Sequence, residues 1–143
     1  MDGLAAQNPD IASVYTAGLT YERRSMKVMV LKTSTSKRNV WIDCGIHARE
    51  WISPATCIWM IDNLITQHSK NPASSLLNYF EFHILSLVNP DGYEYSHSTY
   101  RMWRKNRSPN NGSRCFGTDL NRNYGFKWMV NLANNYMAYS FAY

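Results

Sequence analysis

The sequence lacks the features that mark targeting and membrane-spanning segments. It has no apolar run of about 18 residues, which is the shortest that spans a membrane as a helix. It does not open with the charged, apolar and small-residue regions of a signal peptide. We therefore expect no membrane partner, and the sequence does not itself indicate a cellular compartment.

Cysteine is scarce: there are three, so at least one has no partner inside the chain. Cys44 ends an apolar run and Cys57 lies in an apolar helical stretch, so we expect both to be small buried hydrophobic residues. Cys115 lies in a loop rich in Gly, Ser and Asn, which is the better place for a disulfide. Either it pairs with a cysteine absent from this sequence, or it is a free thiol.

Charged residues are also few, at 17% of the 143 residues, yet the formal net charge is +5. The length and the 45% of hydrophobic residues suit one globular domain. A positive chain suits nucleic acid, an anionic membrane surface or acidic ligands. The one basic cluster is rich in aromatic residues, as in proteins that bind single strands, but no second basic segment continues it. We therefore expect no nucleic-acid partner. The cluster comprises Arg101, Arg104, Lys105 and Arg107.

The hydrophobic pattern predicts strands and helices in alternation. We expect an α/β fold, a mixed sheet flanked by helices. Turn formers follow the last strand at residues 89–92, Asn-Pro-Asp-Gly, and we expect loops beyond them. Ligands of open sheets bind beyond the carboxyl ends of strands, which directs attention to residues 45–50 and to those from 89 onward. The expected helices are 1–7 and 51–68 with a turn at 74–77, and the strands 13–19, 26–33, 40–44 and 79–88.

The first chemical motif, residues 45–51, is Gly-Ile-His-Ala-Arg-Glu-Trp, in the loop between a buried strand and a helix. Zinc binds His nitrogen and carboxylate oxygen, and a catalytic zinc has three protein ligands and one open position for water. His47 and Glu50 are therefore candidate ligands. The same spacing also occurs by chance. In that case Glu50 is a carboxylate favoured by the helix dipole, beside a turn histidine.

Two further motifs offer recognition of anions. In residues 100–107 the arginines can clamp an anion, because a guanidinium matches carboxylate geometry; the alternative is a solvated basic face. Residues 117–124 place amides around Arg122, as a carboxylate receptor would, and Asp119 can orient a ligating histidine. The alternative there is a polar turn whose side chains bond the local backbone.

In this order, the motifs resemble the pancreatic-type zinc metallocarboxypeptidases, the carboxypeptidase A and B family. The resemblance spans about residues 9–128 and about the first half of that family's catalytic domain. It implies an incomplete fold of the zinc-carboxypeptidase type, with residues 1–128 as the N-terminal part of the catalytic domain and 129–143 as a divergent, uncharged tail. The segments that carry it are residues 45–51, 89–93 (Asn-Pro-Asp-Gly-Tyr), 103–107 (Trp-Arg-Lys-Asn-Arg) and 119–123 (Asp-Leu-Asn-Arg-Asn).

The resemblance also implies a role for each site residue, one bound Zn²⁺, hydrolysis at peptide or protein C-termini, and an extracellular location. By position these residues are the metal ligands His47 and Glu50, the carboxylate Asp119 behind the histidine, Arg104 at the scissile carbonyl, Asn121 and Arg122 at the terminal carboxylate, and Arg49 and Arg101 along the cleft.

The family pattern stops after Trp128, and the sequence holds no match to the third zinc-ligand histidine or the general-base glutamate. Of the other histidines, His68 and His83 fit packing or surface positions, and the resemblance implies that His97 occupies a non-ligand position. We therefore expect little or no peptidase activity from this chain. The alternative is a non-catalytic module, or pseudoenzyme fragment, that binds peptide C-termini. Half of a mixed sheet also leaves an apolar edge strand, which predicts self-association.

Overall fold

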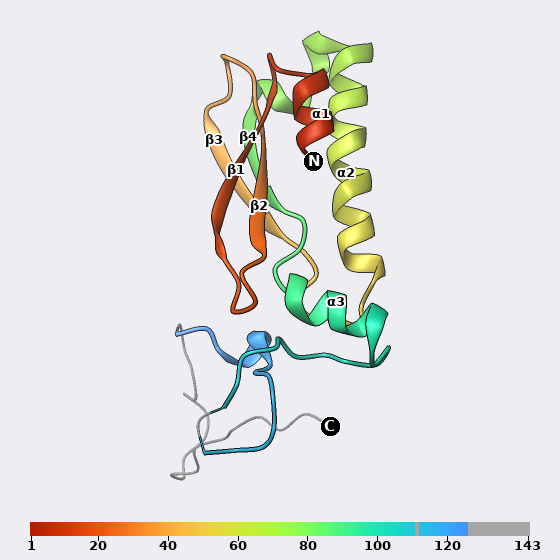
Figure 1. The fold of residues 1–143 in the computed structure, drawn as a ribbon. Helices are drawn as coiled ribbons and strands as arrows, with labels where there is room; N and C mark the ends of the chain where they lie inside the picture. The colour runs from red at the N-terminus through yellow and green to blue at the C-terminus, as the bar shows by residue number, and fades with distance from the viewer. Residues whose placement is uncertain (111, 126–143) are drawn as a thin grey trace.

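The structure, a computed structural model, describes residues 1–110 and 112–125. A twisted sheet forms one layer, helices α1 and α2 form a second layer on one of its faces, and α3 lies near one end (Figure 1). The mixed α/β fold expected from the sequence is confirmed. The elements are α1 (Asp2–Gln7), β1 (Ala12–Leu19), β2 (Ser25–Leu31), β3 (Arg38–Asp43), α2 (Ile52–Lys70), β4 (Phe80–Leu85), α3 (Pro90–Ser98) and the short 3₁₀ turns Pro72–Ser74, Leu76–Asn78 and Leu120–Arg122.

The sheet has four strands in the order β1-β2-β4-β3. β1 pairs with β2 and β2 with β4 in antiparallel fashion, whereas β3 and β4 run parallel. Parallel neighbours need a crossover connection, and the long helix α2 supplies it. Because β3 and β4 are parallel, their carboxyl ends, at Asp43 and Leu85, lie at the same edge of the sheet.

The hydrophobic core lies between the sheet and the two helices. Alternate residues of each strand point to one face, and on this face they meet the inner stripe of α2. The opposite face of the sheet carries a row of rings, in which the His83 ring lies 6.3 Å from that of Tyr15 and 6.5 Å from that of Trp41. The buried core comprises Ala12, Met29, Leu31, Cys57, Ile61, Ile65, Leu77 and Ile84.

The prediction of a turn at residues 89–92 followed by loops is wrong for residues 90–98, which form α3. The sequence Asn-Pro-Asp-Gly is a helix start here: the Asn89 side chain accepts a hydrogen bond from the Gly92 amide, and Pro90 occupies the first turn. Proline is tolerated there because that amide has no helical partner. The same residues that favour turns therefore also cap a helix.

The prediction that Cys44 and Cys57 are simple buried hydrophobic residues is also wrong. Cys44 and Cys57 form a disulfide, and Cys115 is an exposed free thiol. Cys44 follows β3 directly, and Cys57 lies on the face of α2 that packs on the sheet. The turn between them folds the first turns of α2 back against the end of β3, which brings the two side chains together. Both are buried or half-buried, as expected, but as a covalent pair.

No helix among residues 1–110 and 112–125 is long and apolar enough to cross a membrane. The predicted tail, residues 129–143, lies outside the described residues, so the division at residue 128 stays a prediction.

Candidate functional site

The site lies where β3 and β4 end. Beyond the strands the two chain segments stay joined, because the Val88 amide donates to the Cys44 carbonyl at 2.8 Å and the Asn89 amide to the Gly45 carbonyl at 3.1 Å. Gly45 has a φ of 67°, a region that favours glycine. A Cβ there would also lie 2.7 Å from the Leu87 side chain. Glycine therefore permits the sharp exit from β3 that starts the loop carrying His47.

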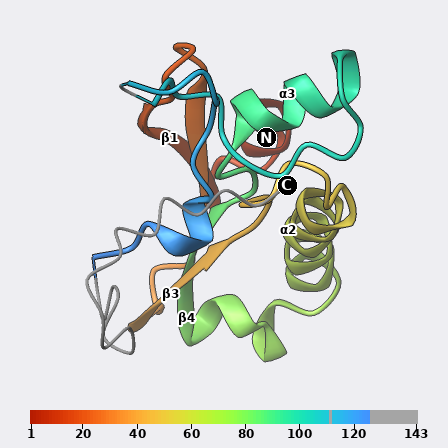
Figure 2. The same cartoon turned by 90° about the horizontal axis from the view of Figure 1, so that it is seen from below.

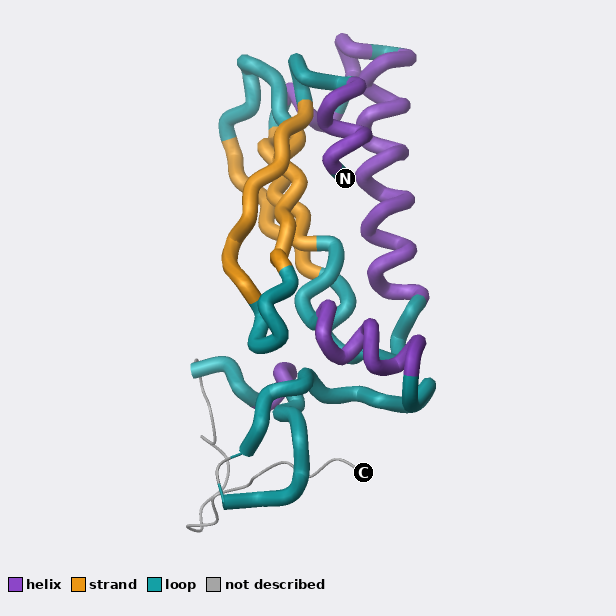
Figure 3. Tube along the Cα trace, viewed as in Figure 1, coloured by secondary structure: helices purple, strands orange, loops and turns teal. Residues whose placement is uncertain are grey.

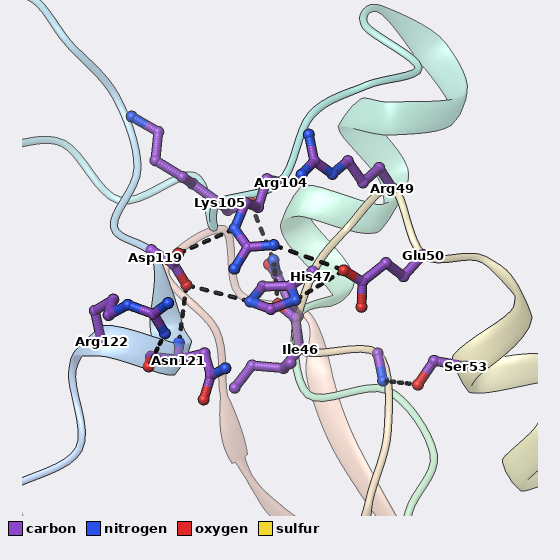
Figure 4. A network of polar contacts seen from close by, with 12 residues as sticks. Ile46, His47, Arg49, Glu50, Ser53, Arg104, Lys105, Asp119, Asn121 and Arg122 are labelled. Atoms are coloured by element: carbon purple, nitrogen blue, oxygen red, sulfur yellow. Dashed lines mark hydrogen bonds and ion pairs between the residues drawn. The ribbon is translucent and has the colours of Figure 1, made fainter. Parts of the chain in front are cut away.

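The His47 imidazole is buried, with 8% of its surface exposed. Its Nδ1 lies 3.0 Å from Glu50 Oε1, and its Nε2 lies 3.3 Å from Asp119 Oδ1 (Figure 4). The two carboxylates thus approach different nitrogens of the ring. Nε2 has no hydrogen bond of good geometry in the described part of the chain. A proton on Nδ1 can be donated to Glu50; a metal bound in place of that proton would put the ring proton on Nε2, on the side of Asp119.

Arg104 joins these two carboxylates. Its Nε donates to Asp119 Oδ2 at 3.0 Å, and its Nη1 lies 3.6 Å from Glu50 Oε1. Burial by itself raises the pKa of Asp119, but the hydrogen bond and charge of Arg104, the Asn121 amide and His47 outweigh burial, so this pKa is lowered. Asp119 is therefore a carboxylate at neutral pH, able to accept from both Arg104 and the imidazole.

Asp119 also starts the Leu120–Arg122 turn, since its Oδ1 accepts the Asn121 amide at 3.0 Å. This cap fixes Asn121 and Arg122 beside the buried carboxylate. Both of these side chains are exposed, and Arg122 Nη1 donates to the Asn121 carbonyl at 2.8 Å. Figure 3 shows this turn beneath the end of the sheet, reached by the long loop that leaves α3, and Figure 2 shows the same turn from below.

The two accessory arginines, Arg49 and Arg101, are in contact with each other. The Arg101 guanidinium lies 3.7 Å above the Trp51 ring and donates to the Arg49 carbonyl at 2.8 Å. The Trp51 ring also stacks on His97, with the ring centroids 3.8 Å apart. Within the described residues, no hydrogen bond or ion pair joins either arginine side chain to His47 or Glu50. Their predicted place in a cleft is not tested by these contacts.

The basic cluster is divided among separate partners. Arg104 faces Asp119, whereas the Arg107 guanidinium lies 3.7 Å above the Tyr95 ring and 4.8 Å from the Trp103 ring. Such cation–π contacts hold an arginine against the protein. The cluster is therefore not one continuous basic strip of the kind that tracks a nucleic-acid backbone.

The donors of His47 and Glu50 fit part of a zinc site. Two ligands bound to one zinc at about 2.0–2.2 Å with tetrahedral angles lie about 3.4 Å apart. Nδ1 of His47 and Oε1 of Glu50, 3.0 Å apart, are somewhat closer than that spacing. Among the described residues no cluster of three or more His, Cys, Asp or Glu side chains could hold a metal ion. Asp119 approaches Nε2 of His47, the ring nitrogen opposite the candidate metal position. It therefore fits the role of the carboxylate that orients the histidine, and not that of a third metal ligand.

Comparison with known proteins identifies the family of the chain. The sequence profile described as Zinc carboxypeptidase matches residues 1–140. Because that match covers nearly the whole chain, the chain belongs to the zinc carboxypeptidase family, a family of metallopeptidases. The family resemblance expected from the motifs is thereby confirmed.

Three relatives illustrate the match. Carboxypeptidase A2 of Rattus norvegicus is 44% identical over 125 residues, which are 87% of this chain and 30% of the relative. Carboxypeptidase O of Homo sapiens is 40% identical over 131 residues, which are 90% of this chain and 35% of the relative. The structure of bovine thrombin-activatable fibrinolysis inhibitor, in complex with tick carboxypeptidase inhibitor, superposes with a TM-score of 0.80 at 41% identity, covering 90% of this chain and 41% of that one.

The chain thus spans about a third of the length of the curated relatives it matches. Of the residues predicted for the site, the structure brings together His47, Glu50, Arg104 and Asp119. It adds one that the sequence reasoning took for a turn former, Asn89, whose side chain is buried between the loops that carry these residues. An asparagine directly before Pro, with Gly three positions on, was the available signal.

Proposed function

We propose that this chain carries the first half of a zinc-carboxypeptidase site, in which His47 and Glu50 bind one zinc ion and nearby guanidiniums receive the free carboxylate of a peptide. The observation that carries the proposal is the His47 imidazole, held between Glu50 on one nitrogen and Asp119 on the other. A structural histidine does not need a carboxylate at each nitrogen, whereas a zinc-ligand histidine commonly has one behind it.

The surrounding residues have separate tasks. Zinc bound there supplies a Lewis acid and a nucleophilic water. Asp119 holds the imidazole in the orientation that turns Nδ1 to the metal position. Arg104, half-buried beside both carboxylates, stabilises negative charge that develops on a substrate carbonyl oxygen. Asn121 and Arg122, at the exposed turn, supply an amide and a guanidinium for the terminal carboxylate of the peptide. Arg49 and Arg101 line the approach.

The chain by itself releases little or no amino acid. Its sequence offers two of three zinc ligands, and the group that would activate the water has no matching residue. The second candidate is a non-catalytic module that captures peptide C-termini, and the exposed Asn121 and Arg122 near Arg104 favour it. Zinc together with peptides ending in Phe, Leu or Arg tests the expected inactivity: robust release of free amino acid would overturn it. Zinc binding separates the two candidates, because only the first needs zinc bound by His47 and Glu50.

An extracellular location is part of the proposal. The Cys44–Cys57 disulfide supports it, because disulfides persist in oxidising compartments and are rare in the cytosol. Non-reducing peptide mapping of chain purified from its natural source tests this: an unpaired Cys44 or Cys57 in that material would count against a secreted protein.

The central experiment removes the two ligands and compares a matched pair. His83 Nε2 lies 3.0 Å from Glu81 Oε1 on β4, so this pair has the same chemistry away from the site. Zinc binding is measured by calorimetry for the wild-type chain, for His47→Ala with Glu50→Ala, and for His83→Ala with Glu81→Ala. We expect zinc binding to be lost only in the first double variant. Equal zinc binding by both double variants would overturn the proposal.

The carboxylate half is tested separately. N-acetyl-Gly-Phe and its C-terminal amide differ only in the terminal group, so preference for the free acid measures carboxylate capture. Replacing Asn121 and Arg122 with alanine should abolish the preference. Arg114→Ala is the control, because Arg114 is an exposed arginine of the same loop region and has no ion pair among the described residues. Retention of the preference in the double variant would remove that turn from the proposal.

A further inference from the structure

The side chain of Asn89 is buried, with 2% of the residue exposed, and its polar atoms all contact backbone of separate segments. Oδ1 accepts the Gly92 amide at 3.0 Å, which caps α3. Nδ2 donates to the Ile46 carbonyl at 3.1 Å and to the Lys105 carbonyl at 3.0 Å. One amide thus joins the start of α3, the loop after β3 and the segment after α3.

The two carbonyls lie beside the site residues. Ile46 directly precedes His47, and Lys105 directly follows Arg104. Besides the contacts of Arg101 with the Arg49 carbonyl and of Arg104 with Glu50, the same two segments touch where the Ala48 amide donates to the Arg104 carbonyl at 3.0 Å. The Asn89 amide and this backbone bond together set how far the His47 loop lies from Arg104.

The packing leaves no room for the amide to move. A Cβ at Gly92 would lie 2.3 Å from the Lys105 carbonyl oxygen and 2.6 Å from Asn89 Nδ2. The first turn of α3 therefore closes directly over the amide, and only glycine allows this approach. The two carbonyl acceptors are consequently held by the asparagine and not by solvent.

We propose that Asn89 is a positioning residue that fixes the His47–Glu50 loop against the Arg104 segment through the carbonyls of Ile46 and Lys105. It touches neither metal nor peptide, and acts only through the backbone of the residues beside it. Its loss lets the two loops shift independently, so that the metal-binding pair and the guanidinium no longer face one point. This inference rests on the proposed function, since it names what holds that site in register.

The test uses the full chain and separates positioning from stability. Asn89→Ser keeps a hydroxyl that can cap α3 but cannot reach both carbonyls. The matched control is Asn78→Ser at the far end of the molecule, where Nδ2 likewise donates to two carbonyls, those of Pro72 at 2.7 Å and Ala73 at 3.3 Å. Zinc affinity and preference for N-acetyl-Gly-Phe over its amide are measured well below the unfolding midpoint of each variant.

We expect Asn89→Ser to lower zinc affinity by about 10-fold or more, the loss typical when a residue supporting a metal ligand is removed, and to reduce the preference for the free acid. Asn78→Ser should keep both at the wild-type level. Wild-type values in folded Asn89→Ser would overturn the positioning role. If Asn89→Ser does not fold, Asn89→Asp takes its place under the same criteria. This variant keeps the cap and the volume of the side chain but cannot donate a hydrogen bond when ionised. Its zinc binding is measured by the rise that zinc causes in the unfolding midpoint. A wild-type chain that binds no zinc would instead overturn the proposed function itself.

Discussion

Asp91 joins the β1–β2 turn to α3, and its replacement should cost much of the stability of the chain. Its buried carboxylate accepts from the Thr20 hydroxyl at 2.6 Å, the Glu22 amide at 3.0 Å and Arg24 Nη1 at 2.8 Å. In the Asp91→Asn variant, one carboxylate oxygen becomes an amide NH₂ that faces donors. A hydrogen bond to a charged group contributes about 1.5–3 kcal/mol, and leaving a buried partner unsatisfied costs about 1–3 kcal/mol.

We therefore expect Asp91→Asn to lower the free energy of unfolding by about 3 kcal/mol at pH 7, close to the cost of breaking a buried ion pair. Urea unfolding followed by circular dichroism measures it. The control is Asp10→Asn, because Asp10 is exposed and its side chain has no hydrogen bond or ion pair among the described residues. This control should change stability by less than about 0.5 kcal/mol.

The direction of the Asp91 pKa shift predicts how the stability difference between wild type and Asp91→Asn changes with pH. Burial raises the pKa of Asp91, but the Thr20 hydroxyl, the Glu22 amide and Arg24 outweigh it, so the pKa lies below the usual 3.8. A lowered folded pKa gives stability that is present above the unfolded pKa and is lost as pH falls through the folded value. The gap between wild type and Asp91→Asn should therefore be constant from pH 7 to about pH 5 and shrink below pH 4. A gap under about 0.5 kcal/mol at pH 7, or one unchanged in acid, would refute the reasoning.

Three other substitutions test single features of the molecule. The disulfide links residues separated by 13 positions. Replacing both Cys44 and Cys57 with serine should therefore lower the free energy of unfolding by about 2–4 kcal/mol. The control is Cys115→Ser, at an exposed thiol, which should leave the urea midpoint unchanged. Trp41 is 53% exposed on the edge strand β3, and we propose that the chain self-associates through this edge. The Trp41→Lys variant should shift the molecular mass measured by light scattering toward that of the monomer. Equal masses for the variant and the wild type would count against the proposal. Asp119→Asn should weaken zinc binding by about 10–100-fold in calorimetry, because Asn cannot serve Arg104 and the imidazole as a carboxylate does; unchanged affinity would contradict the role.

Much of the fold was accessible from the sequence because its signals are local. The strand at Ser25–Leu31 and the helix at Ile52–Lys70 have strong periodic patterns, and their bounds differ from the expected ones by a few residues. The start of α3 was missed because Asn, Pro, Asp and Gly favour a turn and a helix cap alike. Only the contacts of Asn89 and Asp91 with other segments distinguish the two.

The site was predicted in parts, and its assembly was not. Motif spacing located His47, Glu50, Arg104 and Asp119, but their contacts depend on how three loops meet. The disulfide was missed for the same reason, since the pairing of Cys44 depends on where α2 folds back and not on the neighbouring residues. Contacts of this kind arise from tertiary structure, which a local pattern does not encode.

The first turn of α3 contacts both the loops of the site and the β1–β2 turn. Asn89 points toward the site and contacts the Ile46 and Lys105 carbonyls, whereas Asp91, two positions on, contacts the β1–β2 turn at Thr20 and Arg24. Loss of the Asp91 contacts should loosen the turn from α3 while the ties around the metal-binding pair remain. Loss of the Asn89 contacts should disturb those ties directly. Residues two positions apart in one helix turn are therefore expected to separate stability from zinc affinity, because each is bound to a different segment.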